Sequence, residues 1–189
     1  MQRDNCRETK RLLDEAQRQG INYFDLYISN PEVRASVGEA LKGRRDKFII
    51  QSHVCSIWKD GQYKRSRNID EVKAGMEEML SLLQTDYIDV GMIHYVDSLK
   101  DWREIADGPV LPYVKELKEK GTIRHIGLSS HNPEVALEAV KSGCIEVLMF
   151  SVNPCYDLQP ASEDVEELWA EKNYKEHLVN MDPERQELI

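Results

Sequence analysis

The sequence lacks several features that would assign the protein to a particular class. Its longest uncharged apolar stretch is far shorter than the roughly 20 residues of a membrane-spanning helix, and residues 1–4 (MQRD) contain no apolar signal region. We therefore expect a cytoplasmic protein with no membrane partner. A basic surface is also lacking, because the net charge is −9 and the pI is about 5.1. This acidic balance argues against sequence-independent binding to nucleic acid.

Paired cysteines are absent as well. Cys6, Cys55, Cys144 and Cys155 form no CxxC motif, so the sequence indicates neither a zinc knuckle nor a disulfide framework. Free and partly buried thiols are the simpler interpretation. The one basic run, residues 42–47 (KGRRDK), is interpreted as a solvated helix end, since cations favour a helix C-terminus and glycine favours its cap. A phosphate or polyanion site there is the less favoured alternative.

Helix-like and strand-like patterns alternate along the chain. Predicted helices cover residues 7–19, 31–41, 69–83, 112–120 and 134–142, and predicted strands cover residues 21–26, 48–53, 87–94, 123–129 and 145–152. Residues 54–67 and the segment after His94 are predicted to be long loops. A short helix near residues 164–169 and the start of another at Pro183 follow. Because such alternation is typical of a parallel sheet surrounded by helices, we predict an α/β fold with one domain over residues 1–189.

Two local patterns refine this prediction. Met76 and Met79 lie at helical spacing with the other apolar residues of the helix 69–83, which favours a role as core filler over a cofactor contact. Asn132 and Pro133 precede the helix 134–142. We expect Asn132 to cap that helix and Pro133 to occupy its first position.

Polar side chains stand where successive predicted strands end. They are Asp25, His53 and His94, then Ser129, Ser130 and His131, and finally Ser151 and Asn153. One histidine at the end of a strand is more often structural. In a barrel, however, the carboxyl ends of the strands meet at one mouth, so several titratable groups in register predict a functional site.

Longer motifs resemble the aldo-keto reductase family. They are residues 20–25 (GINYFD), 38–47 (GEALKGRRDK), 83–89 (LQTDYID) leading to His94, and 121–129 (GTIRHIGLS). The resemblance covers nearly the whole chain. Residues 30–34 (NPEVR) and 153–157 (NPCYD) resemble most the bacterial branch whose longer members carry a C-terminal ferredoxin-like segment. The cysteine run of that segment is absent here, so a 4Fe-4S cluster is expected only in a longer form.

The resemblance implies a (β/α)8 barrel of the TIM type, here a partial barrel from the first helix to the start of the sixth. It also implies hydride transfer between NADPH and a small-molecule carbonyl substrate, with an Asp, Tyr, Lys and His tetrad. Asp25 and His94 match the Asp and the His of that tetrad. Asn30 stands in place of the Tyr, and His53 stands in place of the Lys. Because Asn cannot donate a proton to an alkoxide, we expect His53 or Tyr27 to substitute for the missing acid.

The implied cofactor contacts are also altered. Ser129 and Ser130 occupy the place of a Ser-Asn pair that holds the nicotinamide carboxamide, and Met149 occupies the place of a Gln. Asn132, Ser151 and Asn153 are further candidates for this site. The first strand of the family's barrel has no counterpart in the 189 residues. The last two strand–helix units, which bind the cofactor phosphates in this family, have none either. We therefore expect the isolated chain to be inactive and its open sheet edges to favour self-association.

Two other functions stay open at this point. Asp25, His53, His94 and His131 are ligand types that a divalent metal ion would accept, which would make the protein a metal-dependent barrel enzyme. Alternatively, the missing Tyr and Lys would fit a degenerate barrel that acts as an interaction or regulatory module. The substrate itself is not specified by the sequence.

Overall fold

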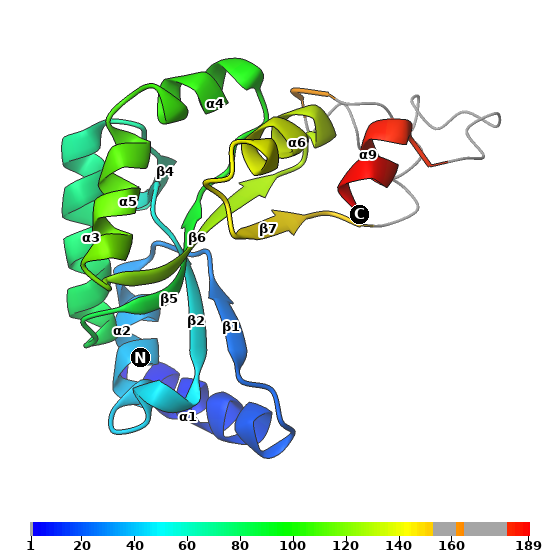
Figure 1. Ribbon diagram of the computed structural model, residues 1–189. Helices are drawn as coiled ribbons and strands as arrows, with labels where there is room; N and C mark the ends of the chain where they lie inside the picture. The colour runs from blue at the N-terminus through cyan, green and yellow to red at the C-terminus, as the bar shows by residue number, and fades with distance from the viewer. Residues whose placement is uncertain (1, 153–161, 165–180) are drawn as a thin grey trace.

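The computed structural model describes residues 2–152, 162–164 and 181–189. Five parallel strands form its central sheet, in the order β1-β2-β5-β6-β7. They are β1 Tyr23–Leu26, β2 Ile49–His53, β5 Ile88–Ile93, β6 Ile123–Ser130 and β7 Val147–Phe150. The sheet curls like part of a barrel wall, and helices cover its outer side (Figure 1). This arrangement confirms the predicted α/β fold and partial (β/α)8 barrel.

Helices connect the strands as the periodicity predicted. They are α1 Gln2–Arg18, α2 Pro31–Leu41, α3 Ile69–Leu83, α4 Leu99–Ala106, α5 Val110–Glu119, α6 Pro133–Lys141 and α9 Pro183–Leu188, with one 3-10 turn, η1 Arg45–Lys47. Asn132 accepts a hydrogen bond from the backbone N–H of Glu134, so its predicted role as the cap of α6 is confirmed. No helix among the described residues is both long enough and apolar enough to cross a bilayer.

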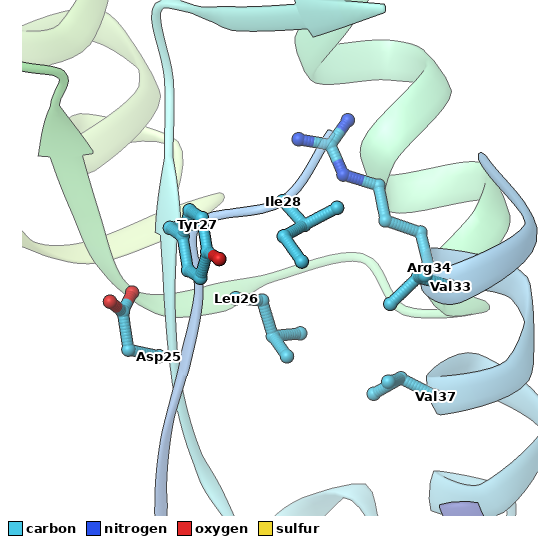
Figure 2. A pocket seen from close by; sticks show the side chains of 7 residues that line it. All are labelled: Asp25, Leu26, Tyr27, Ile28, Val33, Arg34 and Val37. Atoms are coloured by element: carbon cyan, nitrogen blue, oxygen red, sulfur yellow. The ribbon is translucent and has the colours of Figure 1, made fainter. Parts of the chain in front are cut away.

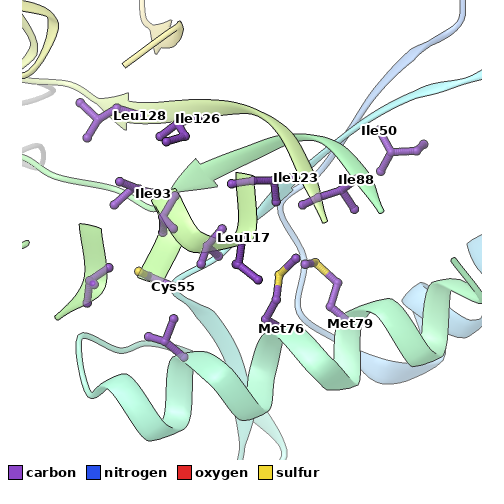
Figure 3. Close-up of a cluster of buried hydrophobic side chains, with 14 of the residues drawn as sticks. Ile50, Cys55, Met76, Met79, Ile88, Ile93, Leu117, Ile123, Ile126 and Leu128 are labelled. Carbon is purple, nitrogen blue, oxygen red and sulfur yellow. The ribbon is translucent and has the colours of Figure 1, made fainter. Parts of the chain in front are cut away.

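The hydrophobic core lies between the sheet and the outer helices. Met76 and Met79 extend from α3 toward Ile88 and Ile123 of the sheet (Figure 3). Both methionines are 1% exposed, which confirms them as core residues. Burying a side chain of this size contributes about 1.5–3 kcal/mol relative to leaving it in water.

A close backbone approach joins α2 to α3. A Cβ atom at Gly38 of α2 would lie 2.3 Å from the carbonyl oxygen of Leu82 and 2.8 Å from Cα of Leu83. Only glycine fits at this contact without a shift of one helix. The sequence motif that contains Gly38 therefore has a packing role.

The predicted loop 54–67 is wrong, because it contains an antiparallel hairpin. Strands β3 Ser56–Lys59 and β4 Gln62–Arg65 pair across a turn at Asp60 and Gly61, whose φ angles are 55° and 76°. Two positive φ angles are the requirement of a type I′ turn, and Asp-Gly is one of its preferred sequences. That dipeptide is the signal that would have located the hairpin.

The loop predicted after His94 also differs from the structure, because helix α4 occupies part of it. Ser98 caps α4 by accepting a hydrogen bond from the N–H of Asp101, and Trp102 and Ile105 point into the core. Tertiary burial of two large side chains stabilises this short helix. The predicted helix near residues 164–169 and the motif 153–157 lie outside the described residues.

Asp89 of β5, which is 5% exposed, bonds to the amino ends of the neighbouring strands β2 and β6. Its carboxylate pairs with Arg45 at 2.8 Å and with Arg124 at 2.8 Å, and it accepts the N–H of Ile50 at 2.9 Å. The interpretation of residues 42–47 as a solvated helix end is therefore wrong for Arg45, whose side chain is only 14% exposed. Cys6, Cys55 and Cys144 are free thiols, as expected, and Cys155 lies outside the described residues.

Candidate active site

Three side chains at the carboxyl ends of neighbouring strands form one hydrogen-bonded chain. Asp25 of β1 contacts His53 of β2 through Oδ1 and Nε2, which are 2.9 Å apart. His53 contacts His94, directly after β5, through the two Nδ1 atoms at 2.5 Å. The imidazole of His53 is fully buried, whereas a third of the Asp25 side chain (33%) is exposed. The parallel register of β1, β2 and β5 thus brings together residues that are 28 and 41 positions apart in the sequence.

The electrostatics of these three side chains favour an ionised Asp25 and an uncharged His94. Burial is the largest influence on Asp25 and raises its pKa, but the hydrogen bond and the charge of His53 outweigh it, so the pKa of Asp25 lies below its usual value. The pKa of His94 is lowered to about 3, first by burial and then by the charges of His53 and Arg67. His94 is therefore neutral at neutral pH.

Two tyrosines and an arginine surround His94. The rings of Tyr63 and Tyr95 stand edge-on to its imidazole, with centroids 5.8 and 5.1 Å away. Arg67 donates hydrogen bonds to the carbonyl oxygens of His94 and Tyr95 and pairs with Asp101 at 2.7 Å. These contacts fix the loop that carries His94. The contact of Tyr63 with His94 was not predicted, because Tyr63 reaches His94 only through the unpredicted hairpin.

Asn30 and Tyr27 lie near the start of α2 and are not part of this hydrogen-bonded chain. The side-chain oxygen of Asn30 caps α2 by accepting the N–H groups of Glu32 at 2.9 Å and Val33 at 3.3 Å. Tyr27 is 57% exposed, and its side chain lies close to Asp25 (Figure 2). Asn30 thus has a structural role in the helix, while the hydroxyl of Tyr27 has no hydrogen-bond partner among the described residues.

Ser130, the last residue of β6, and Asn132, which follows the strand, both contact Asp97. The hydroxyl of Ser130 lies 3.4 Å from Asp97 Oδ1, and the amide nitrogen of Asn132 donates to the carbonyl oxygen of Asp97 at 3.0 Å. Ser129 is 3% exposed, and its hydroxyl makes no hydrogen bond within the described part of the chain. Of these candidates for holding a nicotinamide, Ser129 is the one with a free donor.

Met149 and Ser151 stand on and after the edge strand β7. The sulfur of Met149 accepts a hydrogen bond from Nε2 of Gln51 at 3.3 Å, and Gln51 in turn accepts the hydroxyl of Tyr23 at 2.7 Å. Gln51 is also the register partner of Asp25, so these contacts adjoin the hydrogen-bonded site. Ser151 is half-buried, and Asn153 lies outside the described residues.

The four residues considered as metal ligands do not converge on one point, because His131 binds Asp97 instead of the other three. Nδ1 of His131 bonds to Oδ2 of Asp97 at 3.0 Å, and the ring of Tyr95 lies edge-on between His94 and His131. Among the residues that the structure describes, no three His, Cys, Asp or Glu side chains are placed to bind one ion. The geometry does not favour the metal-dependent alternative.

Comparison with known proteins agrees with this fold. A sequence profile described as the Aldo/keto reductase family matches residues 2–176. Oxidoreductase YqkF of Bacillus subtilis is 32% identical over 159 residues, which cover 79% of this chain and 48% of the relative. Aldo-keto reductase YhdN of the same organism is 37% identical over 100 residues, which cover 52% of this chain and 29% of the relative. The chain thus spans about half the length, or less, of these curated relatives.

Solved structures give the same result. The holo form of an aldo-keto reductase from Bacillus halodurans is 31% identical with a TM-score of 0.66, over 76% of this chain and 48% of that one. A more distant aldo-keto reductase from Klebsiella pneumoniae, solved in complex with NADPH, is 17% identical with a TM-score of 0.58, over 77% of this chain and 48% of that one, and so supports the fold alone. With the profile match over nearly all of its length, the chain belongs to the Aldo/keto reductase family.

Proposed function

We propose that this chain carries the proton-transfer residues of a cytoplasmic, NADPH-dependent reductase of small carbonyl compounds. The observation that carries the proposal is the continuous hydrogen-bonded chain Asp25–His53–His94 at the carboxyl ends of three strands. We assign these three residues to the place of the family's tetrad, where they would supply the proton that the Asn30 side chain cannot donate. Membership of an oxidoreductase family supports the reaction class.

The residues present fit a nicotinamide cofactor in part. NADPH, when bound, supplies the hydride that is added to the carbonyl carbon. Ser129 would hold the carboxamide group, since its hydroxyl is free and lies near the mouth end of β6. Met149 and Ser151 stand on the neighbouring strand and would complete that wall, with Asn153 as a further candidate. Ser130 and Asn132 would act indirectly, because their side chains bind Asp97.

The proposed route starts from the form in which both ring nitrogens of His53 carry a proton. Its Nε2–H donates to the carboxylate of Asp25, and its Nδ1–H donates to Nδ1 of His94. His94 is then neutral, with its own proton on Nε2. That nitrogen has no hydrogen-bond partner among the described residues, so it is available to donate to the oxygen of a carbonyl substrate.

Proton transfer then follows the hydrogen bonds. As the carbonyl oxygen gains negative charge, His94 gives it the Nε2 proton and takes the Nδ1 proton of His53. His53 ends neutral and still bonded to Asp25, and the product is an alcohol. Uptake of one proton from water restores His53. The low pKa of His94 suits this role, because His94 passes a proton on without holding a second one.

The first test is the rate of NADPH oxidation with a panel of small aldehydes. We propose that the 189 residues alone turn over no carbonyl, so the assay uses this chain and any longer product of the same reading frame. In an active product, His53→Gln is expected to lower kcat by about 10²–10⁴-fold. Tyr27→Phe, the matched control for the other acid candidate, is expected to have little effect. If Tyr27→Phe lowers kcat more than His53→Gln does, Tyr27 is the acid.

A second readout needs no turnover. When His53 loses its proton, its Nδ1 can only accept, so the proton of His94 must move from Nε2 to Nδ1. Imidazole 15N spectra of the 189-residue chain are expected to show this change of tautomer in His94 as the pH rises. A His94 tautomer that stays constant over the whole pH range would refute the proton route. An active enzyme with no such coupling would preserve the family assignment but not the mechanism.

Loss of all reductase activity in every form of the protein would favour the alternative of an interaction or regulatory module.

Self-association is a related proposal. Strands β1 and β7 each have one unpaired edge within the described part of the sheet, and such edges favour pairing with a second copy. Light scattering over a range of concentrations would detect the dimer. A 4Fe-4S cluster in a longer form stays a prediction.

A further inference from the structure

Arg65 of β4 is a cation with unused hydrogen-bond donors beside His94. Its guanidinium carbon lies 4.7 Å from the centre of the Tyr95 ring, and its Nη1 donates to the carbonyl oxygen of Tyr95 at 2.9 Å. Nη1 is the one side-chain nitrogen of Arg65 with a hydrogen-bond partner among the described residues. The side chain is 38% exposed. Water or a small ligand therefore has access to this residue, whose position the Tyr95 contacts fix.

One carboxylate serves two arginines in this region. Both oxygens of Asp101 bind Arg67, at 2.8 Å to Nε and at 2.7 Å to Nη2. Nη1 of Arg65 lies 3.6 Å from the same carboxylate, which is beyond hydrogen-bond distance. No other carboxylate in the described part of the chain forms an ion pair with Arg65. The group of three therefore has a net positive charge, and Arg65 is its more exposed arginine.

Two phenol groups adjoin this cation. Tyr63 and Arg65 are two positions apart on β4, so their side chains extend from the same face of the hairpin. Burial is the largest influence on Tyr63 and raises its pKa, with smaller contributions from Tyr95, which raises it, and Arg65, which lowers it. The hydroxyl of Tyr63 is therefore protonated at neutral pH. Neither phenol hydroxyl forms a hydrogen bond within the described residues, so both can donate to a ligand on Arg65.

The imidazole of His94 lies close enough to share a small ligand with Arg65. The Tyr95 ring contacts both groups, with its centroid 5.1 Å from the centroid of His94 and 4.7 Å from the guanidinium carbon. The separation of the two groups cannot exceed the sum of these distances. A hydrogen bond of about 3 Å at each end uses much of that separation. Only a few atoms can therefore connect a group on His94 with a group on Arg65.

We propose that the substrate reduced at this site is a short oxoacid, with its carbonyl oxygen on Nε2 of His94 and its carboxylate on Arg65. The inference rests on the proposed function, which places the carbonyl at His94, and it names the substrate class. A carboxylate accepts hydrogen bonds from a guanidinium and from phenol groups, and its single charge balances the one unpaired arginine. A phosphate ester carries more charge than this group neutralises, and an uncharged aldehyde leaves Arg65 without a partner.

The first test is binding to the 189-residue chain without cofactor, so that no turnover occurs. The ligand is 4-oxobutanoate, a four-carbon aldehyde that ends in a carboxylate. Butanal, which has no charge, and butyrate, which has no carbonyl, are the controls. The Nε–H resonance of Arg65 and the imidazole 15N resonances of His94 report on the two ends. We expect 4-oxobutanoate to shift both in a saturable way, butyrate to shift Arg65 alone, and butanal to bind more weakly by roughly tenfold or more.

Variants of the hairpin locate the carboxylate. Arg65→Gln removes the charge and is expected to weaken 4-oxobutanoate binding by roughly tenfold or more, with no effect on butanal. Arg65→Lys keeps the charge but loses the planar fork, so its affinity should lie between the two. Lys64→Gln is the matched control, because it removes a charge from the adjacent position, whose side chain pairs with Asp60 at 2.7 Å and extends from the other face of β4. It should bind 4-oxobutanoate normally.

Kinetics give a second readout in any longer product that is active. Arg65→Gln should raise KM for 4-oxobutanoate and leave kcat nearly unchanged, since Arg65 holds a part of the substrate that does not react. The kinetic constants for butanal should not change. A loss of kcat with both substrates would instead mean that Arg65 supports the structure of the site, and would contradict the proposal.

Three binding results would overturn the proposal. They are equal affinity for butanal and 4-oxobutanoate, undiminished binding by folded Arg65→Gln, and a 4-oxobutanoate complex in which either Arg65 or His94 does not shift. If Arg65→Gln does not fold, the wild-type resonances and Arg65→Lys still decide. Binding at both residues by a protein that has no reductase activity in any form would refute the proposed function alone.

Discussion

The ring of Tyr63 lies edge-on to the imidazole of His94, with centroids 5.8 Å apart and planes at 83°. Tyr63 belongs to β4 of the hairpin, so this contact packs the hairpin against the residue that follows β5. The phenol ring covers part of His94, and burial is the largest cause of the low pKa of that histidine. The hairpin thus contributes to the protonation state of the site.

Removal of this ring should raise the pKa of His94. Tyr63→Ala exposes the imidazole to water, which stabilises its charged form. Tyr63→Phe keeps the ring and loses only the hydroxyl, so it should leave the pKa of His94 close to that of the wild type. Histidine-resolved NMR titrations compare the two variants. An equal shift in both would mean that the hydroxyl, rather than coverage, controls His94.

Stability should fall as the pH decreases below about 6.5. The pKa of His94 is about 3 in the folded chain against 6.5 for the ordinary residue, so the unfolded state binds more protons between these values and is favoured by acid. Asp25, whose pKa is also lowered on folding, acts in the same direction at the lower end of this range. For His94 alone, the free energy of unfolding is expected to fall by about 2 kcal/mol between pH 7 and pH 5.

Urea unfolding at several pH values measures this slope. His94→Gln removes the titrating group and should flatten the profile between pH 7 and pH 5. If the variant keeps the wild-type slope, the destabilisation arises from other groups.

The ion pairs at the amino ends of the strands should differ in strength. Arg45 and Asp89 are both well covered, with side chains 14% and 7% exposed, so Arg45→Gln is expected to lower the free energy of unfolding by about 3 kcal/mol. Arg124 contacts the same carboxylate from a 55% exposed position. Arg124→Gln should therefore cost less than about 1 kcal/mol. Equal losses in denaturant unfolding would show that burial does not set the strength of these pairs.

Two helical glycines allow a matched comparison. A Cβ atom at Gly38 meets the backbone of Leu82 at 2.3 Å, whereas one at Gly75 meets only Cγ2 of Ile57 at 2.8 Å and Cβ of Ile57 at 3.8 Å. Backbone cannot move aside as a side chain can, so Gly38→Ala is expected to cost about 1–3 kcal/mol. Gly75→Ala should cost less, because alanine favours a helix and Ile57 can adjust. Thermal unfolding ranks the two, and a greater loss at Gly75 would contradict the packing argument.

The sequence was sufficient to predict the five strands of the parallel sheet and the strand-end residues, because both follow from local periodicity. Asp25, His53 and His94 were identified by position alone. Their hydrogen bonds were not, since these depend on the register of three strands and on side-chain rotamers. Helix α4 was missed because its stability comes from burial of Trp102 and Ile105 rather than from a strong local pattern.

The hairpin was missed for a different reason. Its strands, residues 56–59 and 62–65, have four residues each and carry no alternating pattern, so only the turn at Asp60 and Gly61 is informative. Arg34 of α2, which is 1% exposed, shows the same limitation, because nothing in the helical pattern distinguishes a buried arginine from a solvated one. Both features are set by contacts between segments that are distant in the sequence.

Strand β5 connects Asp89, near its first residue, with His94, just after its last. Near its amino end, Asp89 pairs with Arg45 of η1 and Arg124 of β6, while its carboxyl end leads to the His94 imidazole that bonds to His53. Substitutions at one end therefore need not disturb the other. A chain built in this way can change its chemistry over evolutionary time while the same ion pairs keep the sheet in register.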